Sequence, residues 1–169
     1  KGTFRELCKS IGQKNITEFS YRLDKTQEAK ILLGLEFSKG EEEKKSFVKS
    51  MKNKKYKITD LSDDEISKVH LRYMSGGRAP EFLDGNVEEV FKVDFPERPG
   101  ALMQFLELLK DKWNITLFHY KNQGSIYGGA LVGFSLKPSQ LENLNKDLLK
   151  TEYPFLRVSD NAGYKAFLK

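Results

Sequence analysis

Apolar residues along this chain follow the same pattern twice. Between residues 3 and 11 they recur three and four positions apart, which predicts an amphipathic helix with one buried stripe. The same spacing returns between residues 101 and 109. The two stripes are formed by Phe4, Leu7, Cys8 and Ile11, and by Leu102, Phe105, Leu106 and Leu109. A repeat on this scale indicates a duplicated structural unit.

Each of these helices is followed by nearly the same eight residues. NITEFSYR occupies positions 15–22 and NITLFHYK positions 114–121, and their alternating pattern predicts a strand in both places. Apolar runs at 29–37 and 127–136 predict the next strands. Each run contains a glycine at the matching position, Gly34 and Gly133, and a glycine inside a strand often marks the close approach of another backbone or a ligand.

The later segments complete each unit. Helices are predicted over 40–54 and 138–150, and short strands over 56–61 and 153–159, while the second half opens with a strand at 87–95. The order strand, helix, strand, strand, helix, strand is the ferredoxin-like βαββαβ arrangement. We therefore expect an α+β fold of two tandem units, of which the first lacks its N-terminal strand. Because that strand is normally central, we expect a segment that precedes this chain to supply it.

The two halves are joined by a segment of mixed character. Its first part, 62–73, has a capping pattern and an apolar stripe, which predict a connecting helix. Gly76 and Gly77 end that helix. We expect the first unit and its helix over 1–74, a linker over 75–86 and the second unit over 87–169.

Composition favours a globular protein without a membrane span. The formal net charge is +5, but the lysines are spread along the chain. The densest basic cluster, 52–57, falls at the end of a predicted helix, where cations complement the helix dipole. The single cysteine, Cys8, excludes an intramolecular disulfide and favours a reducing, cytoplasmic setting. No secretory signal is apparent, and no apolar run approaches the roughly 20 residues of a membrane-spanning helix.

Motifs of known catalytic and nucleotide-binding sites are missing. The sequence has no phosphate-binding P-loop, no dinucleotide fingerprint and no nucleophile elbow, and its two histidines are too few for most metal sites. His70 lies beside an apolar stripe, which favours a structural role. The glycine-led turns at Gly2 and Gly100 are better candidates. Each opens a helix whose free N–H groups favour a carboxylate or phosphate, although each is also explained as a tight turn.

The two eight-residue strands 15–22 and 114–121, called the octets below, could supply the walls of such a site. Alternation places Thr17, Phe19 and Tyr21 on one face, with Thr116, Phe118 and Tyr120 as their counterparts. An apolar wall, a tyrosine hydroxyl and an anion-binding turn suit a small aliphatic amino acid, in two related sites or in one site at the junction. On the opposite face, Glu18 and Ser20 stand where the second copy has Leu117 and His119. We therefore expect the second copy's outer face to meet a partner surface or an effector, and the first copy's outer face to be wetter.

Three long segments of the sequence resemble a known family. DLSDDEISKVHLRYMSGGRAP, FPERPGALMQFL and WNITLFHYKNQGSIYGGALVGF are similar to the C-terminal regulatory region of biosynthetic threonine deaminase (threonine ammonia-lyase). The similarity extends over essentially the whole chain. It implies two ACT-like subdomains that bind isoleucine as feedback inhibitor and valine as opposing activator. It also implies a separate N-terminal catalytic domain that uses pyridoxal phosphate, and a tetrameric enzyme, so this chain alone would hold no cofactor and would not act on threonine.

The resemblance also implies roles for individual residues. The effector-site tyrosines of the family correspond to Tyr21 and Tyr120. A glycine-led turn of the family has a counterpart in each half of this chain, at Gly2 and at Gly100. Lys121 stands where the family commonly has arginine. The implied effector-binding residues are Tyr21, Tyr120, Gly2, Arg98, Gly100, Ala101, His119, Lys121 and Arg22, and the implied hinge residues are Gly76, Gly77 and Arg78.

Two other functions fit the fold class. A βαββαβ unit is also the fold of RNA-recognition modules, which need exposed aromatic residues on their central strands. The run 128–136 has glycine and leucine at such positions, so it matches that pattern poorly. The third interpretation is an enzyme that acts without a partner domain. We expect neither nucleic acid nor a membrane as a partner.

Overall fold

The computed structural model describes residues 3–23, 30–64, 79, 81–82, 85–96, 98–122 and 127–168. The greater part of the predicted connecting helix, the hinge residues Gly76, Gly77 and Arg78, and the turn residue Gly2 lie outside these ranges. The division into two units with a linker therefore stays a prediction.

Most of the expected helices and strands form, except the strand over 56–61 in the first half, and the second half has one added helix. In the first half these are α1 (Thr3–Ile11), β1 (Asn15–Arg22), β2 (Lys30–Glu36) and α2 (Gly40–Asn53). In the second half they are β3 (Val87–Pro96), α4 (Ala101–Leu109), β4 (Asn114–Lys121), β5 (Tyr127–Leu136), α5 (Leu141–Leu149), β6 (Phe155–Arg157) and α6 (Ala162–Phe167). Short 3₁₀ turns, Lys110–Lys112 and Pro138–Gln140, precede β4 and α5. The short helix α6 has no counterpart in the predicted elements.

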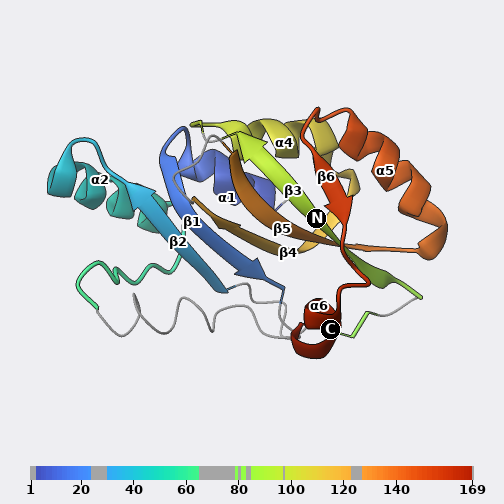
Figure 1. Ribbon diagram of the computed structural model, residues 1–169. Helices are drawn as coiled ribbons and strands as arrows, with labels where there is room; N and C mark the ends of the chain where they lie inside the picture. Colours follow the sequence, from blue (N-terminus) through green and yellow to red (C-terminus); the bar gives the residue numbers. More distant parts are fainter. Residues whose placement is uncertain are drawn as a thin grey trace.

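One antiparallel sheet contains all six strands of the described residues, in the order β2-β1-β4-β5-β3-β6 (Figure 1). The second half has the ferredoxin-like strand arrangement, and the α+β fold of tandem ACT-like units is confirmed. The halves join through the two octets, because β1 pairs with β4. At the middle of this pairing Ser20 faces His119, its own counterpart 99 positions later. The pairing therefore has an internal two-fold symmetry.

The expected strand over 56–61 is not formed. These residues are irregular, although Tyr56 and Ile58 pack against the core. In the second half the corresponding strand, β6, is held by pairing with β3, the first strand of its unit. Among the described residues of the first half no such first strand is present, so the backbone groups of 56–61 have no ladder to join there.

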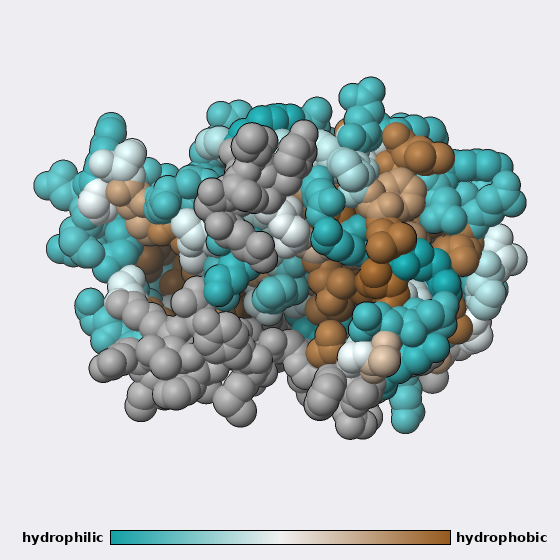
Figure 2. Space-filling view, viewed as in Figure 1, coloured by the Kyte–Doolittle hydropathy of each residue, from teal (hydrophilic) through white to brown (hydrophobic). Residues whose placement is uncertain are grey.

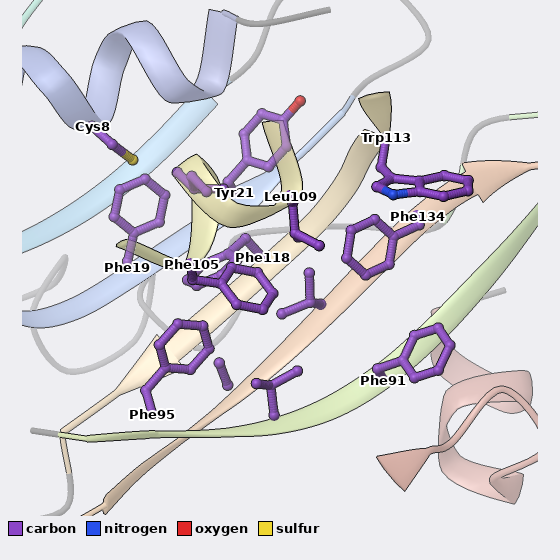
Figure 3. Close-up of a cluster of buried hydrophobic side chains, with 14 of the residues drawn as sticks. Cys8, Phe19, Tyr21, Phe91, Phe95, Phe105, Leu109, Trp113, Phe118 and Phe134 are labelled. Atoms are coloured by element: carbon purple, nitrogen blue, oxygen red, sulfur yellow. The ribbon is translucent and has the colours of Figure 1, made fainter. Parts of the chain in front are cut away.

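The main core lies between the sheet and the helices α1, α4 and α5, which cover one face (Figure 1). Aromatic side chains fill its centre, as Figure 3 shows, and Phe19, Phe105 and Phe118 are at most 1% exposed. Cys8 is buried among them, which confirms its predicted place in the core. A smaller cluster on the opposite face joins Val90 and Leu117 to Tyr164 of α6.

Matching irregularities in the octet strands explain the repeated glycines. Pairing shifts by one residue between Ile16 and Glu18, and again between Ile115 and Leu117. A Cβ on Gly34 would lie 2.6 Å from the Thr17 hydroxyl, and one on Gly133 would lie 2.9 Å from the Leu117 Cβ. Both glycines therefore make room for a bulged neighbour. The bulge also turns Thr116 to the face opposite Phe118 and Tyr120, so its predicted place beside them is wrong.

An apolar area is exposed at the edge of the sheet that is formed by β6. Leu149, at the end of α5, is 67% exposed, and Leu156 of β6 is 64% exposed. Figure 2 shows apolar surface on the side of the molecule where α5 and β6 lie.

Candidate functional site

A small cavity lies where the two halves meet. Its volume is about 40 Å³, and three parts of the chain line it. The turn from α1 to β1 contributes one side and the turn from β3 to α4 the other, while aromatic residues form the wall. The lining residues are Cys8, Gly12, Lys14, Asn15 and Ile16 from the first half, and Phe95, Pro96, Arg98, Gly100, Ala101, Leu102, Met103, Phe118 and Tyr120 from the second.

The helix α4 begins at this cavity. Gly100 adopts a left-handed conformation (φ 84°) just before the helix, and Gly100 and the first three helical residues line the cavity. The Ala101 N–H donates to the Arg98 carbonyl (3.3 Å), and an Arg98 Nη2 donates to the Gln104 side chain. Buried Tyr153 donates to the Ala101 carbonyl (3.2 Å), which fixes this end of α4 from behind. The first turn of α4 therefore presents a positive helix end to the cavity.

Tyr120 forms part of the cavity wall and depends on a glycine behind it. A Cβ on Gly128 would lie 2.5 Å from the Tyr120 Cε2 atom, so the ring occupies the space that any larger residue would need. The ring also meets Phe95 nearly edge to face, with the ring centres 6.4 Å apart. The Tyr120 side chain is half-buried, as expected for a residue with an apolar body and a polar tip.

Tyr21, the matching tyrosine, is packed differently. It is 8% exposed, and the ring of Phe4 lies against it with centres 5.0 Å apart. Its hydroxyl donates to the Ile115 carbonyl (3.3 Å), and burial raises the pKa of the phenol. Figure 3 shows this hydroxyl directed away from the surrounding aromatic cluster. Leu102, which aligns with Phe4, lines the cavity instead, so only the tyrosine of the second octet belongs to its wall.

Arg22, His119 and Lys121 lie on the other face of the sheet. Strand alternation turns them away from Tyr21 and Tyr120. Arg22 is buried and donates two hydrogen bonds to Glu88 (2.8 and 3.1 Å) and one to the Leu168 carbonyl (2.8 Å). The structure therefore brings Tyr120, Arg98, Gly100 and Ala101 together at the cavity. Arg22, His119 and Lys121 do not line it.

The outer face of the octets does not show the expected difference in exposure. Glu18 and Ser20 are only 6% and 4% exposed, while of their counterparts Leu117 is 4% exposed and His119 is exposed. The predicted wetter first copy is therefore wrong. Partial desolvation is the main cause of the lowered pKa of His119, with Lys121 lowering it further and Glu18 acting in the opposite direction.

Several cavity residues are missing from the sequence-based set. Lys14, Asn15 and Ile16 come from the α1–β1 turn and the start of β1, Cys8 comes from the apolar stripe of α1, and Met103 lies in the first turn of α4 outside its stripe. Their periodicity predicts core or turn positions and contains no signal of a shared cavity. Lys14 is also ion-paired with Glu43 of α2, with a Nζ–Oε1 distance of 2.5 Å.

The described residues hold neither a metal-binding cluster nor a membrane-spanning helix. No group of three or more His, Cys, Asp or Glu side chains in the described ranges is arranged to hold a metal ion. Within the same ranges, no helix has the length and apolar character needed to span a membrane.

Comparison with known proteins identifies the family. A family model described as the C-terminal regulatory domain of threonine dehydratase, another name for threonine deaminase, matches residues 1–71 and 82–168. L-threonine dehydratase biosynthetic IlvA of Escherichia coli is 43% identical over 99% of this chain, and that of Burkholderia multivorans is 40% identical. The chloroplastic biosynthetic enzyme of Arabidopsis thaliana is 35% identical. The chain spans 32% of each bacterial relative and 27% of the plant relative. The chain therefore belongs to the family of C-terminal regulatory domains of threonine dehydratase.

Proposed function

We propose that this chain senses branched-chain amino acids for a threonine dehydratase. Isoleucine binds in the cavity between the halves as feedback inhibitor, and valine opposes it as activator. One observation supports this most strongly: the cavity combines an apolar wall, the Tyr120 phenol and the N-terminal end of α4. The family match favours this function over a nucleic-acid-binding module or an independent enzyme.

The lining of the cavity suits the parts of an aliphatic amino acid. The α-carboxylate would lie at the first turn of α4, where the helix presents its positive end to the cavity and Arg98 adds a positive charge. The aliphatic side chain would lie against Ile16 and Met103. The hydroxyl of Tyr120 would fix the orientation of the polar end.

The size of the cavity links binding to movement. A volume of about 40 Å³ holds roughly three water molecules, at about 10–15 Å³ for each. Isoleucine therefore requires the cavity to open. The two turns that line the cavity belong to different halves, so a ligand would shift one half relative to the other. If one state of the enzyme favours the shifted arrangement of the two halves, a ligand that binds this arrangement increases the population of that state, which is how a regulatory signal acts.

Discrimination between the two effectors rests on a small difference. Isoleucine has one more methylene than valine, which is worth about 1–3 kcal/mol in an apolar pocket. Opposite effects therefore need different preferred states of the protein rather than different affinities alone. A coupling free energy of about 1–3 kcal/mol between the regulatory and catalytic sites is typical of such systems.

The catalytic steps would take place in the remainder of the longer enzyme. We place pyridoxal phosphate in a catalytic domain N-terminal to this chain, in a cytoplasmic homotetramer. The cofactor does not fit the cavity described above, because about 40 Å³ is too small for its ring and the one lysine lining it, Lys14, is ion-paired with Glu43. This chain would supply effector binding and the hinge at Gly76, Gly77 and Arg78.

Isothermal titration calorimetry of the folded chain tests the proposal directly. We expect saturable heat with isoleucine and valine, and much weaker heat with threonine. Ala101→Leu fills the cavity from α4 and should abolish binding, while the exposed Leu108→Ala on the same helix should not. Absence of heat with both effectors, on a sample whose circular dichroism shows the fold, would refute the proposal.

A further inference from the structure

Lys14 connects the cavity to the helix α2. It lines the cavity, while its Nζ lies 2.5 Å from the Glu43 Oε1 atom. The ammonium also lies 5.4 Å from the ring centre of Phe37 and 5.9 Å from that of Phe47. Both charged side chains are 23% exposed, so water screens this pair less than it screens most surface pairs. One side chain thus contacts both a binding cavity and a separate structural element.

Glu43 is a strong partner for this lysine. It lies in the first turn of α2, where its carboxylate also accepts the Lys39 N–H (3.0 Å) and the Ser38 hydroxyl (3.3 Å). The hydrogen bond from Lys14, followed by that from Lys39, lowers the pKa of Glu43 to about 2. Glu43 is therefore ionised at neutral pH and ties the N-terminal end of α2 to the α1–β1 turn.

We propose that the carboxylate of a bound amino acid competes with Glu43 for Lys14, so that occupation of the cavity loosens the N-terminal end of α2. This inference rests on the proposed function, since it needs an amino acid in the cavity. It adds Lys14 as a ligand-binding residue and names the element that receives the signal.

Electrostatics explains why the two carboxylates would compete. A lysine ammonium has three donors and could in principle bind both. That arrangement would bring two negative charges within about 4–6 Å of each other, where each disfavours the ionised form of the other. Binding at the cavity therefore weakens the bond to Glu43. By thermodynamic linkage, loss of Glu43 must strengthen binding to the same degree.

The position of α2 determines which part of the fold this exchange releases. The helix lies beside β2, at the end of the sheet opposite β6 (Figure 1). Its attachments to the core include the buried Met51 near its C-terminal end and the contact of Phe47 with Phe37. The N-terminal turn is attached to the α1–β1 turn through Glu43, while Lys44, directly after that turn, pairs with Asp60 (3.2 Å) on another side. Release of Glu43 would therefore free that turn while Met51 keeps the helix in place.

A set of charge-removing variants of the chain tests this link. Glu43→Gln removes the competitor, and Lys14→Met removes the shared cation. Glu41→Gln is the matched control: Glu41 lies in the same helical turn, but it pairs with Lys44 and is 69% exposed. The affinity for isoleucine is measured by calorimetry, and the amide hydrogen exchange of α2 by mass spectrometry, with and without isoleucine.

We expect Glu43→Gln to bind isoleucine about fivefold more tightly than wild type, with fast exchange in the first turn of α2 even without ligand. Lys14→Met should bind at least about tenfold more weakly, and adding Glu43→Gln to it should change the affinity no further. Glu41→Gln should match wild type. Tight binding to wild type together with an unchanged affinity of Glu43→Gln would overturn the link but leave the proposed function intact. Failure of wild type to bind isoleucine or valine would overturn both.

Discussion

Ser20 and His119 face each other across the pairing of β1 with β4, and each is the other's counterpart in the internal repeat. Backbone hydrogen bonds repeat around this pair, since the Leu23 N–H donates to the Thr116 carbonyl and the Asn122 N–H to the Thr17 carbonyl, both at 2.9 Å. The two halves are thus related in their backbones. Their side chains differ, and the differences place the cavity beside one octet.

The two octet tyrosines should respond differently to loss of the hydroxyl. Tyr120→Phe should weaken isoleucine binding about fivefold, the value of one hydrogen bond of about 1 kcal/mol. Tyr21→Phe should leave the affinity nearly unchanged but lower the free energy of unfolding by about 1 kcal/mol, because its hydroxyl bonds the Ile115 carbonyl. Calorimetry and urea denaturation measure the two effects. Equal losses of affinity would contradict the assignment of the cavity to Tyr120.

Gly128 should be essential for the position of Tyr120. Gly128→Ala would place a Cβ 2.5 Å from the tyrosine ring, which forces the ring to move and costs about 1–3 kcal/mol of stability. Isoleucine affinity should fall with it. The neighbouring Gly129→Ala is the control, because a Cβ there meets no atom within 4 Å. If both alanine variants bind isoleucine equally well, the close approach has no functional role.

The buried pair of Arg22 and Glu88 should be important for stability. Glu88 also accepts the hydroxyls of Thr116 (2.5 Å) and Tyr164 (2.6 Å), so this pair joins the octets to α6. Arg22→Met would leave the buried carboxylate without its cation and should cost about 3–5 kcal/mol in urea denaturation. Lys146→Met breaks the exposed pair with Glu142 and should cost less than about 1 kcal/mol. Similar costs for both would show that the buried pair is not coupled to the fold.

Cys8 should make the protein less stable at alkaline pH. Burial raises the pKa of this thiol from 9.0 to about 12. The folded protein keeps the proton that the unfolded chain releases, so the contribution is fully present below pH 9 and is lost as the pH rises towards 12. Urea denaturation between pH 8 and 10.5 should show a decline that Cys8→Ala reduces. A thiol reagent should label Cys8 slowly at pH 8 and rapidly in urea. Rapid labelling of the folded chain would contradict the burial.

Local pattern determined most of the elements in this protein. The stripes of α1 and α4 and the alternation of the octets come from neighbours in sequence, so their periodicity identifies them. The duplication also predicted which elements correspond. These features, with the family resemblance, predicted the fold class and identified Tyr120 and the turn at Gly100 as candidate effector-binding residues.

Tertiary structure decided those features that depend on contacts between residues far apart in the sequence. The strand over 56–61 needs a neighbouring strand, and the turn of Thr116 to the outer face depends on a bulge opposite Gly133. Lys14 and Met103 share a cavity only because the halves pair through β1 and β4. Phe4 fills the space beside Tyr21 while Leu102 lines a cavity, and sequence spacing does not distinguish these outcomes. Periodicity reports on local geometry, whereas a site between two units depends on contacts between residues about a hundred positions apart.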